Sequence, residues 1–132
     1  MIQPKPQIIS FLIADHIIQE GASHKWSVIG IFDRITAVKF PCLQQNLALY
    51  VKFCDAEGEY DVRVEFTDTQ AHKLGAFGGI KLRVASRLEH PDFGVVTRSL
   101  AIPAPGKYNF DLYFNEQLVG SFPLEVLQAA AP

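Results

Sequence analysis

Apolar and polar residues alternate one by one along much of this chain, and this period of two is what most limits its fold. In residues 60–66, and again in 108–114, every second residue is large and apolar, and most of the residues between them are polar or charged. Such alternation is typical of β-strands that bury one face. No long window carries apolar residues at the three- and four-residue spacing of a helix. The chain is therefore predicted to be all-β.

Turn-forming residues divide the chain into about seven to eight strands. The expected strands are 8–19, 26–35, 47–54, 60–67, 80–85, 95–102, 107–114 and 118–126. Strands with apolar faces and no helices between them need a second layer to cover them, which predicts one sandwich domain over residues 1–132. Residues 1–6 are expected to be an extended lead-in and 128–132 a frayed tail. The predicted core residues are Val62, Val64, Phe66, Ile80, Leu82, Val84, Tyr108, Phe110, Leu112 and Phe114.

Opposite charges on two of these strands indicate that they are neighbours. The polar positions of 60–67 are mainly acidic, whereas those of 80–85 are basic. Each cross-strand pair of opposite charges contributes only ~0.2–1 kcal/mol, but the pattern favours pairing of the two strands. The segment 68–79 between them is predicted to be a long loop, either a flexible connection or a functional element.

Composition and charge exclude several classes of function. Of the 132 residues, 48% are hydrophobic and the net charge is −2, which disfavours general binding to nucleic-acid backbones. No stretch approaches the ~20 apolar residues of a membrane span. The apolar run 8–14 lacks a convincing signal-peptide cleavage site. We therefore expect a soluble protein without nucleic-acid or membrane partners.

The two cysteines bear on the compartment. Cys42 and Cys54 flank one predicted strand, whose extended backbone separates them by far more than the ~7 Å between Cα atoms that a disulfide permits. Two free thiols are therefore predicted, which favours a reducing compartment such as the cytoplasm.

The stretch from Pro105 through Gly106 and Tyr108 to Phe110 resembles the tyrosine corner of immunoglobulin-like domains. In such a corner, the hydroxyl of a tyrosine near the start of the penultimate strand bonds to an upstream backbone group. The resemblance implies an immunoglobulin-like antiparallel β-sandwich. It places Tyr108 at the corner and Phe110 at the core position two residues later, with Trp26 as a candidate central aromatic residue.

Four short stretches resemble a family of small uncharacterised bacterial proteins of about this length, described as a domain of unknown function. They are 14–15, 30–35, 40–41 and the corner at 105–108, and they include Gly30 and Phe32 as structural residues. Where that family commonly has Gly-Lys before its second strand, this chain has His24-Lys25. The resemblance implies one immunoglobulin-like domain from a bacterium and carries over no activity.

No residues form a catalytic or metal-binding pattern. The histidines, which are His16, His24, His72 and His90, are never paired at metal-ligand spacing on one element. Asp15 and His16 point to opposite faces of a strand, so at most one can join a site with His24. Neither cysteine has nucleophile signals around it. No catalytic residue, metal or cofactor is predicted, and the protein is expected not to be an enzyme.

Three charged or glycine-rich segments have structural explanations. The glycine-rich segment 75–79 opens no helix and lacks a following Lys-Ser or Lys-Thr, which argues against a phosphate loop. Asp33 and Arg34 are interpreted as an ion-paired strand end. A possible basic stripe is interpreted as a solvated sheet face rather than a nucleic-acid site. Its members are Lys81, Arg83, Arg87 and Arg98.

Two hypotheses for function follow. The mean hydropathy is +0.12, and strands 8–19 and 26–35 are apolar on both faces, although a two-layer sandwich leaves one face of each strand in water. We therefore predict a protein-interaction or assembly module acting through a sheet face or strand edge, most simply as a homodimer. The alternative is a small-ligand or enzymatic pocket near loop 68–79 and corner 103–106. It requires Asp68, His72 or Asp92 to converge.

Overall fold

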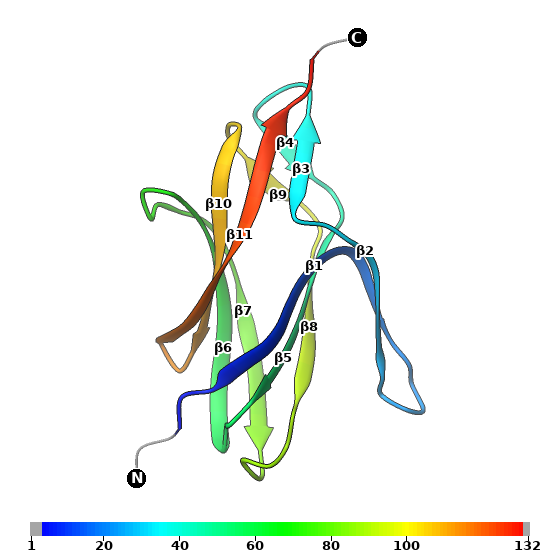
Figure 1. Ribbon diagram of the computed structural model, residues 1–132, viewed down its shortest axis with the longest axis vertical. Coiled ribbons are helices and arrows are strands. Elements are labelled where there is room, and N and C mark those ends of the chain that lie inside the picture. The colour runs from blue at the N-terminus through cyan, green and yellow to red at the C-terminus, as the bar shows by residue number, and fades with distance from the viewer. Residues whose placement is uncertain (1–3, 131–132) are drawn as a thin grey trace.

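Strands and turns make up the whole of residues 4–130, the part of the chain that the computed structural model describes (Figure 1). The predicted all-β class is confirmed. These residues contain no helix, and so none that could span a membrane. The strands are β1 (Gln7–Gln19), β2 (Trp26–Ile31), β3 (Arg34–Ala37), β4 (Cys42–Gln44), β5 (Leu47–Cys54), β6 (Gly58–Asp68), β7 (Lys73–Val84), β8 (Asp92–Thr97), β9 (Leu100–Ile102), β10 (Gly106–Phe114) and β11 (Gln117–Gln128).

The described residues thus hold eleven strands rather than about seven to eight. The predicted strand 26–35 is two strands, β2 and β3, and the predicted strand 95–102 is also two, β8 and β9. The short strand β4 was not predicted. In both divided strands the chain leaves one sheet and joins another. Alternation reports which face of a strand is buried but not which strand it pairs with, so it does not reveal such a change.

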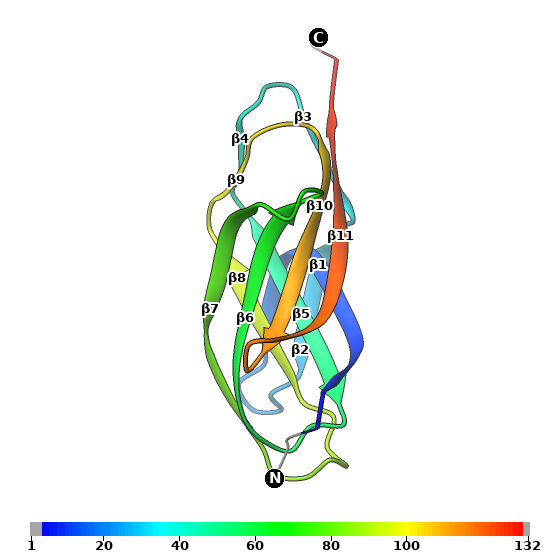
Figure 2. The same ribbon diagram turned by 90° about the vertical axis from the view of Figure 1, so that its left-hand side faces the viewer.

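Two sheets pack face to face around the core. One has the strand order β2-β1-β5-β8 and the other β3-β11-β10-β6-β7, while β4 and β9 form a small third sheet. Figure 2 shows the strands of one layer in front of those of the other. The ring of Phe53 on β5 lies edge-on to that of Phe114 on β10, with centroids 4.9 Å apart. Phe11 on β1 stacks on Phe122 of β11 at 4.0 Å, so aromatic contacts join the two layers.

Most of the core residues predicted from alternation are buried. On β6 and β10 all seven predicted core residues are buried, and so is Val84 on β7. Ile80 and Leu82 are only half-buried. They lie on β7, which is the edge strand of its sheet and has a neighbour on one side only. The buried residues on β6 and β10 are Val62, Val64, Phe66, Tyr108, Phe110, Leu112 and Phe114.

The predicted pairing of β6 with β7 is confirmed, and the predicted long loop between them is wrong. Asp61 lies opposite Lys81 and Glu59 opposite Arg83. Strand β7 already begins at Lys73, so only residues 69–72 connect the two strands. Two register shifts in the β6–β7 pairing accommodate the glycine-rich stretch within β7. Irregular pairing of this kind conceals a strand from a search for strict alternation.

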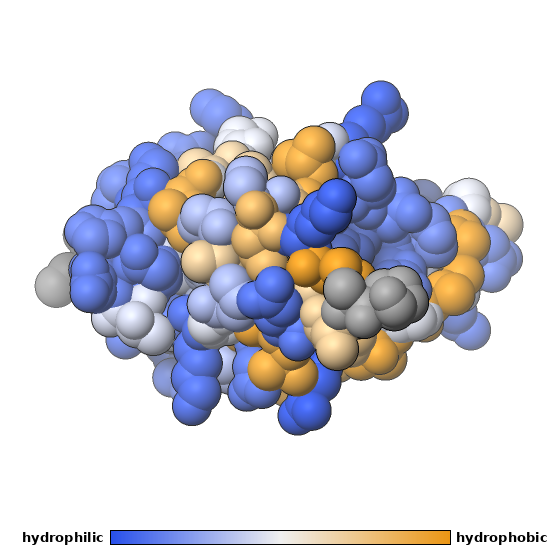
Figure 3. All heavy atoms as spheres, turned by 90° about the horizontal axis from the view of Figure 1, so that it is seen from above, coloured by the Kyte–Doolittle hydropathy of each residue, from blue (hydrophilic) through white to orange (hydrophobic). Residues whose placement is uncertain are grey.

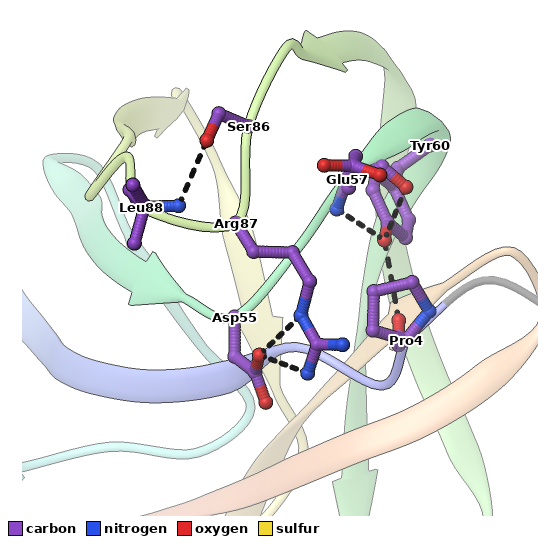
Figure 4. Close-up of polar contacts among 7 residues, drawn as sticks. All are labelled: Pro4, Asp55, Glu57, Tyr60, Ser86, Arg87 and Leu88. Atoms are coloured by element: carbon purple, nitrogen blue, oxygen red, sulfur yellow. Dashed lines mark hydrogen bonds and ion pairs between the residues drawn. The ribbon is translucent and has the colours of Figure 1, made fainter.

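The ends of the described chain are held by backbone and side-chain contacts. The hydroxyl of Tyr60 donates a hydrogen bond to the carbonyl oxygen of Pro4 at 3.2 Å (Figure 4). In the predicted tail, Gln128 is the last residue of β11, and the amide of Ala129 donates to the carbonyl oxygen of Ala37. Residues 1–3 of the predicted lead-in and 131–132 of the predicted tail lie outside the described residues.

At the corner, the hydroxyl of Tyr108 donates a hydrogen bond of 2.5 Å to the carbonyl oxygen of Ala104. Pro105 and Gly106, the first residue of β10, are exposed and lie between these two residues. Two residues beyond Tyr108, Phe110 is fully buried and contacts the rings of Phe11 and Phe66. The corner therefore fixes the start of β10 against the segment that precedes it.

Candidate functional site

The β1–β2 hairpin is the part of the fold that departs from the two layers. The first half of β1 pairs with β5 as far as Ala14, and its second half pairs instead with β2, from Ala14 to Gln19. Figure 1 shows this hairpin projecting to the right of the two sheets. Its two faces therefore have different surroundings.

One face of the hairpin packs on the outer surface of the four-stranded sheet. Leu49 and Val51 of β5 are buried in the core, so Tyr50 between them and its partner Gly94 on β8 face outward. A Cβ atom at Gly94 would overlap Cδ1 of Ile17 and lie 2.8 Å from Cζ3 of Trp26. The absence of a side chain at Gly94 therefore allows the hairpin to lie close against the sheet.

Trp26 is not a central core aromatic, and that prediction is wrong. It is half-buried on the hairpin, with its ring centroid 6.4 Å from that of Tyr50, outside the space between the sheets. Its indole Nε1 is buried without a hydrogen-bond partner. Phe53 and Phe114 occupy the centre instead, because the hairpin carries Trp26 away from the two-layer core.

Tyr50 connects this contact to β8. Its hydroxyl donates a hydrogen bond of 2.7 Å to Oδ2 of Asp92. Burial, followed by the hydrogen bond and the negative charge of Asp92, raises the pKa of Tyr50 to about 12. The protonated tyrosine is therefore the form that suits the packed hairpin.

The opposite face of the hairpin exposes three isoleucines. Ile18, Ile29 and Ile31 are 55%, 47% and 60% exposed. The partner of Ile18 on β2 is Ser27, and Ser27, Ile29 and Ile31 alternate along β2, so all three isoleucines point to one side. We call this surface the isoleucine face. In Figure 3, seen from above, hydrophobic residues lie in several separate groups, one of them on the right, the side toward which the hairpin projects.

The open edge of β2, beside the isoleucine face, lacks the residues that usually prevent pairing with another strand. β2 is an edge strand, and its six residues include no charge and no proline. The other edge strands of the two large sheets each carry a charged residue: β3 has Arg34, β8 has Asp92, and β7 has several, besides its register shifts. Natural proteins use charges, prolines and bulges to prevent pairing at an open edge. β2 lacks the first two, and its register with β1 does not shift, although the pairing omits Asp15 and Gly30.

Gly30 and Phe32 shape the base of the hairpin. Gly30 has φ of +74°, and a Cβ there would overlap the Asp15 carboxylate, with Cγ at 3.0 Å. The group that approaches the backbone of Gly30 is therefore the Asp15 carboxylate. Beyond it, the amide of Phe32 donates to the carbonyl oxygen of Ile13, and the half-buried ring packs against the core. The chain then crosses to the other sheet as β3.

Comparison with family models gives a match over residues 9–127. The chain belongs to DUF6941, a family of unknown function. The match includes the hairpin, both sheets and the corner. It also includes all four sequence stretches that resembled a family of uncharacterised proteins. Comparison with curated proteins found no match.

The histidines considered as possible metal ligands are dispersed in this DUF6941 chain. His16 lies on β1 opposite Ile29, and His24 lies in the turn of the hairpin. Nδ1 of His72 lies 3.0 Å from Oδ2 of Asp68, a contact within the β6–β7 turn. The hydrogen bonds of Asp68, chiefly from the His72 backbone amide, lower the pKa of its carboxyl group. Within residues 4–130, no three His, Cys, Asp or Glu side chains are grouped as metal ligands.

The predicted basic stripe is spread over separate segments. Lys81 lies 3.8 Å from Asp61 on the sheet face, and Arg83 lies opposite Glu59. Arg87 bonds Asp55 through Nε at 2.7 Å in the loops at one end of the molecule (Figure 4). Arg98 follows β8, on the other sheet. The four side chains therefore do not line one groove.

The remaining candidates also lie apart. Cys42 is on β4 and Cys54 ends β5, and both thiols are free. Nε of Arg34 and Oδ1 of Asp33 are 3.8 Å apart, and both side chains are well exposed. Asp92 is bonded to Tyr50 on the four-stranded sheet, whereas Asp68 and His72 bond each other beside the five-stranded sheet. The polar groups required by the ligand-pocket hypothesis thus lie in two separate places.

Proposed function

We propose that this DUF6941 protein is a non-enzymatic interaction module that contacts protein through the isoleucine face and the adjoining edge of β2. The observation that carries the proposal is the side-by-side exposure of Ile18, Ile29 and Ile31 on a hairpin whose edge strand has neither charge nor proline. Clustered apolar residues on a surface mark contact sites more often than single exposed ones do. An open strand edge offers backbone groups for pairing with another chain.

The docking of the hairpin supports this assignment. Ile17 and Trp26 hold one face against Gly94, so the hairpin is not a loose appendage whose apolar residues turn inward when no partner is present. The isoleucine face is presented outward on a supported element. A surface that is already positioned spends less conformational entropy on binding.

We also propose that the fold is immunoglobulin-like. Two observations support it. The short strand β3 runs parallel to the last strand β11, with Arg34 opposite Glu125, while the other pairings of the sheets are antiparallel. The Tyr108 hydroxyl bonds the backbone four residues upstream at the start of the penultimate strand. In such domains function resides in surface sites rather than in the shared framework.

The alternative of a small-ligand or enzymatic pocket has weaker support. Its required groups lie on different sheets, and segment 73–79, which was to border the pocket, is part of β7. No observation favours it over the interaction module.

Site-specific photo-crosslinking in the cells that produce the protein tests the proposal. A photo-reactive amino acid at position 29 is expected to give crosslinked species of higher mass. The matched control places it at position 88, because Leu88 is 89% exposed but lies alone in the β7–β8 loop (Figure 4). Adding Ile18→Ser and Ile31→Ser to the position-29 protein should remove the crosslinks. Equal crosslinking at 88, or none at 29, would refute the interaction surface.

A further inference from the structure

We infer that the partner of the β2 edge is a second copy of this chain, with the two β2 strands paired antiparallel about a two-fold axis. This inference rests on the proposed function and specifies its partner. The pairing would extend the four-stranded sheet of each copy through β2 into that of the other. Main-chain hydrogen bonds would then satisfy the backbone groups that β2 leaves open.

The geometry of antiparallel pairing limits the register. Paired residues point to the same face, so a two-fold axis perpendicular to the sheet pairs odd-numbered residues with odd-numbered ones. An axis at Ile29 sets that residue beside its own copy and Ser27 beside Ile31 of the second copy. The isoleucine faces of both hairpins then lie on one side of the joined sheet, with His16 and Ser27 of each copy among the isoleucines.

Charge complementarity selects the antiparallel arrangement. Lys25 immediately precedes β2 and Asp33 follows it, and both side chains are exposed, that of Asp33 by 87%. In the antiparallel dimer each Lys25 is directed toward Asp33 of the other copy. A parallel pairing would instead bring Lys25 to Lys25 and Asp33 to Asp33. Opposite charges across strands stabilise pairing, and like charges oppose it.

The area of contact predicts a weak dimer. A single short strand buries much less than the ~800 Å² per partner of a standard stable interface. We therefore expect a dissociation constant of about micromolar or weaker. Such a dimer forms at high protein concentration and separates on dilution, which makes it measurable by light scattering.

A charge-swap experiment on the full chain tests the register. The native mass of the wild type should fall from dimer to monomer over about a hundredfold dilution. Lys25→Glu alone and Asp33→Lys alone each set like charges at both symmetric contacts, and each should weaken dimerisation about tenfold. Thermal melts confirm that both variants are folded.

Mixing the two variants provides the matched control. An equimolar mixture of Lys25→Glu and Asp33→Lys should dimerise like the wild type. In the mixed dimer the introduced glutamate of one copy faces the introduced lysine of the other, and at the second contact the native Lys25 faces the native Asp33. Opposite charges therefore meet at both contacts again.

The outcomes separate this inference from the proposed function. A wild type that stays monomeric throughout overturns the inference, and crosslinks from position 29 to a different protein would still support the interaction module. A dimer that the single variants leave intact, or that the mixture does not restore, also overturns the inference, because the copies then meet elsewhere. Restoration on mixing supports it, since no intramolecular effect of either charge predicts that result.

Discussion

Phe110 has no exposed surface and contacts rings from both sheets, Phe11 at 6.3 Å and Phe66 at 5.1 Å. Phe110→Ala is expected to lower the free energy of unfolding by about 3–5 kcal/mol, through lost burial and the cavity it leaves. Urea denaturation measures the loss. Tyr113→Ala, on the partly exposed face of the same strand, is the control and should cost less. A loss below about 1 kcal/mol for Phe110→Ala would contradict its place in the core.

Tyr50 predicts a dependence of stability on alkaline pH. Its pKa is raised to about 12 in the folded protein, whereas an unfolded tyrosine titrates near 10. Between these values the folded state binds more protons than the unfolded state, so stability falls as pH rises from about 10 to 12. Denaturation series across this range should show a shallower decline in Tyr50→Phe, which lacks the titrating group. Equal slopes in the two proteins would show that Tyr50 is not held against Asp92.

Among the structural elements, the docking of the hairpin depends on one glycine. Gly94→Val would place atoms where Ile17 and Trp26 now lie and should force the hairpin from the sheet. Trp26 is the only tryptophan, so its fluorescence should shift to longer wavelength as the ring meets water. Gly21→Val is the matched control, because a Cβ there meets nothing within 4 Å. An unchanged spectrum in Gly94→Val would mean that the hairpin does not rest on Gly94.

The sequence predicted a strand well where burial of one face in the core was the only reason for its pattern of apolar residues. Strict alternation on β6 and β10 reflects one buried and one solvated face, so their core residues were assigned correctly. The strand over 26–35 failed because β2 and β3 are both apolar for different reasons. β2 contacts the outside of one sheet, and β3 buries Ile35 in the core. Strand β7 was hidden by its glycines and register shifts.

For the molecule as a whole, the sequence predicted an excess of apolar residues in the first two strands but not where they lie. Ile17 and Ile18 are neighbours in sequence, yet one packs on Gly94 and the other is exposed. Alternation along β1 points the two side chains to opposite faces, whereas the departure of β1 from β5 after Ala14, a tertiary feature, decides which face is covered. The sequence could therefore predict the isoleucine face only as an excess of apolar residues, without its position. Its three members became identifiable once the register of the hairpin was known.

The parallel pairing of β3 with β11 also has a consequence for the time at which the protein can fold. A ribosome releases Arg34 well before Glu125, yet the two lie side by side in the finished sheet. Hairpins between neighbouring strands can form during translation, but β3 and Ile35 must wait for the final strand. The nascent chain therefore carries an unfinished core until β11 has been synthesised. Throughout that interval its exposed apolar segments are prone to aggregation.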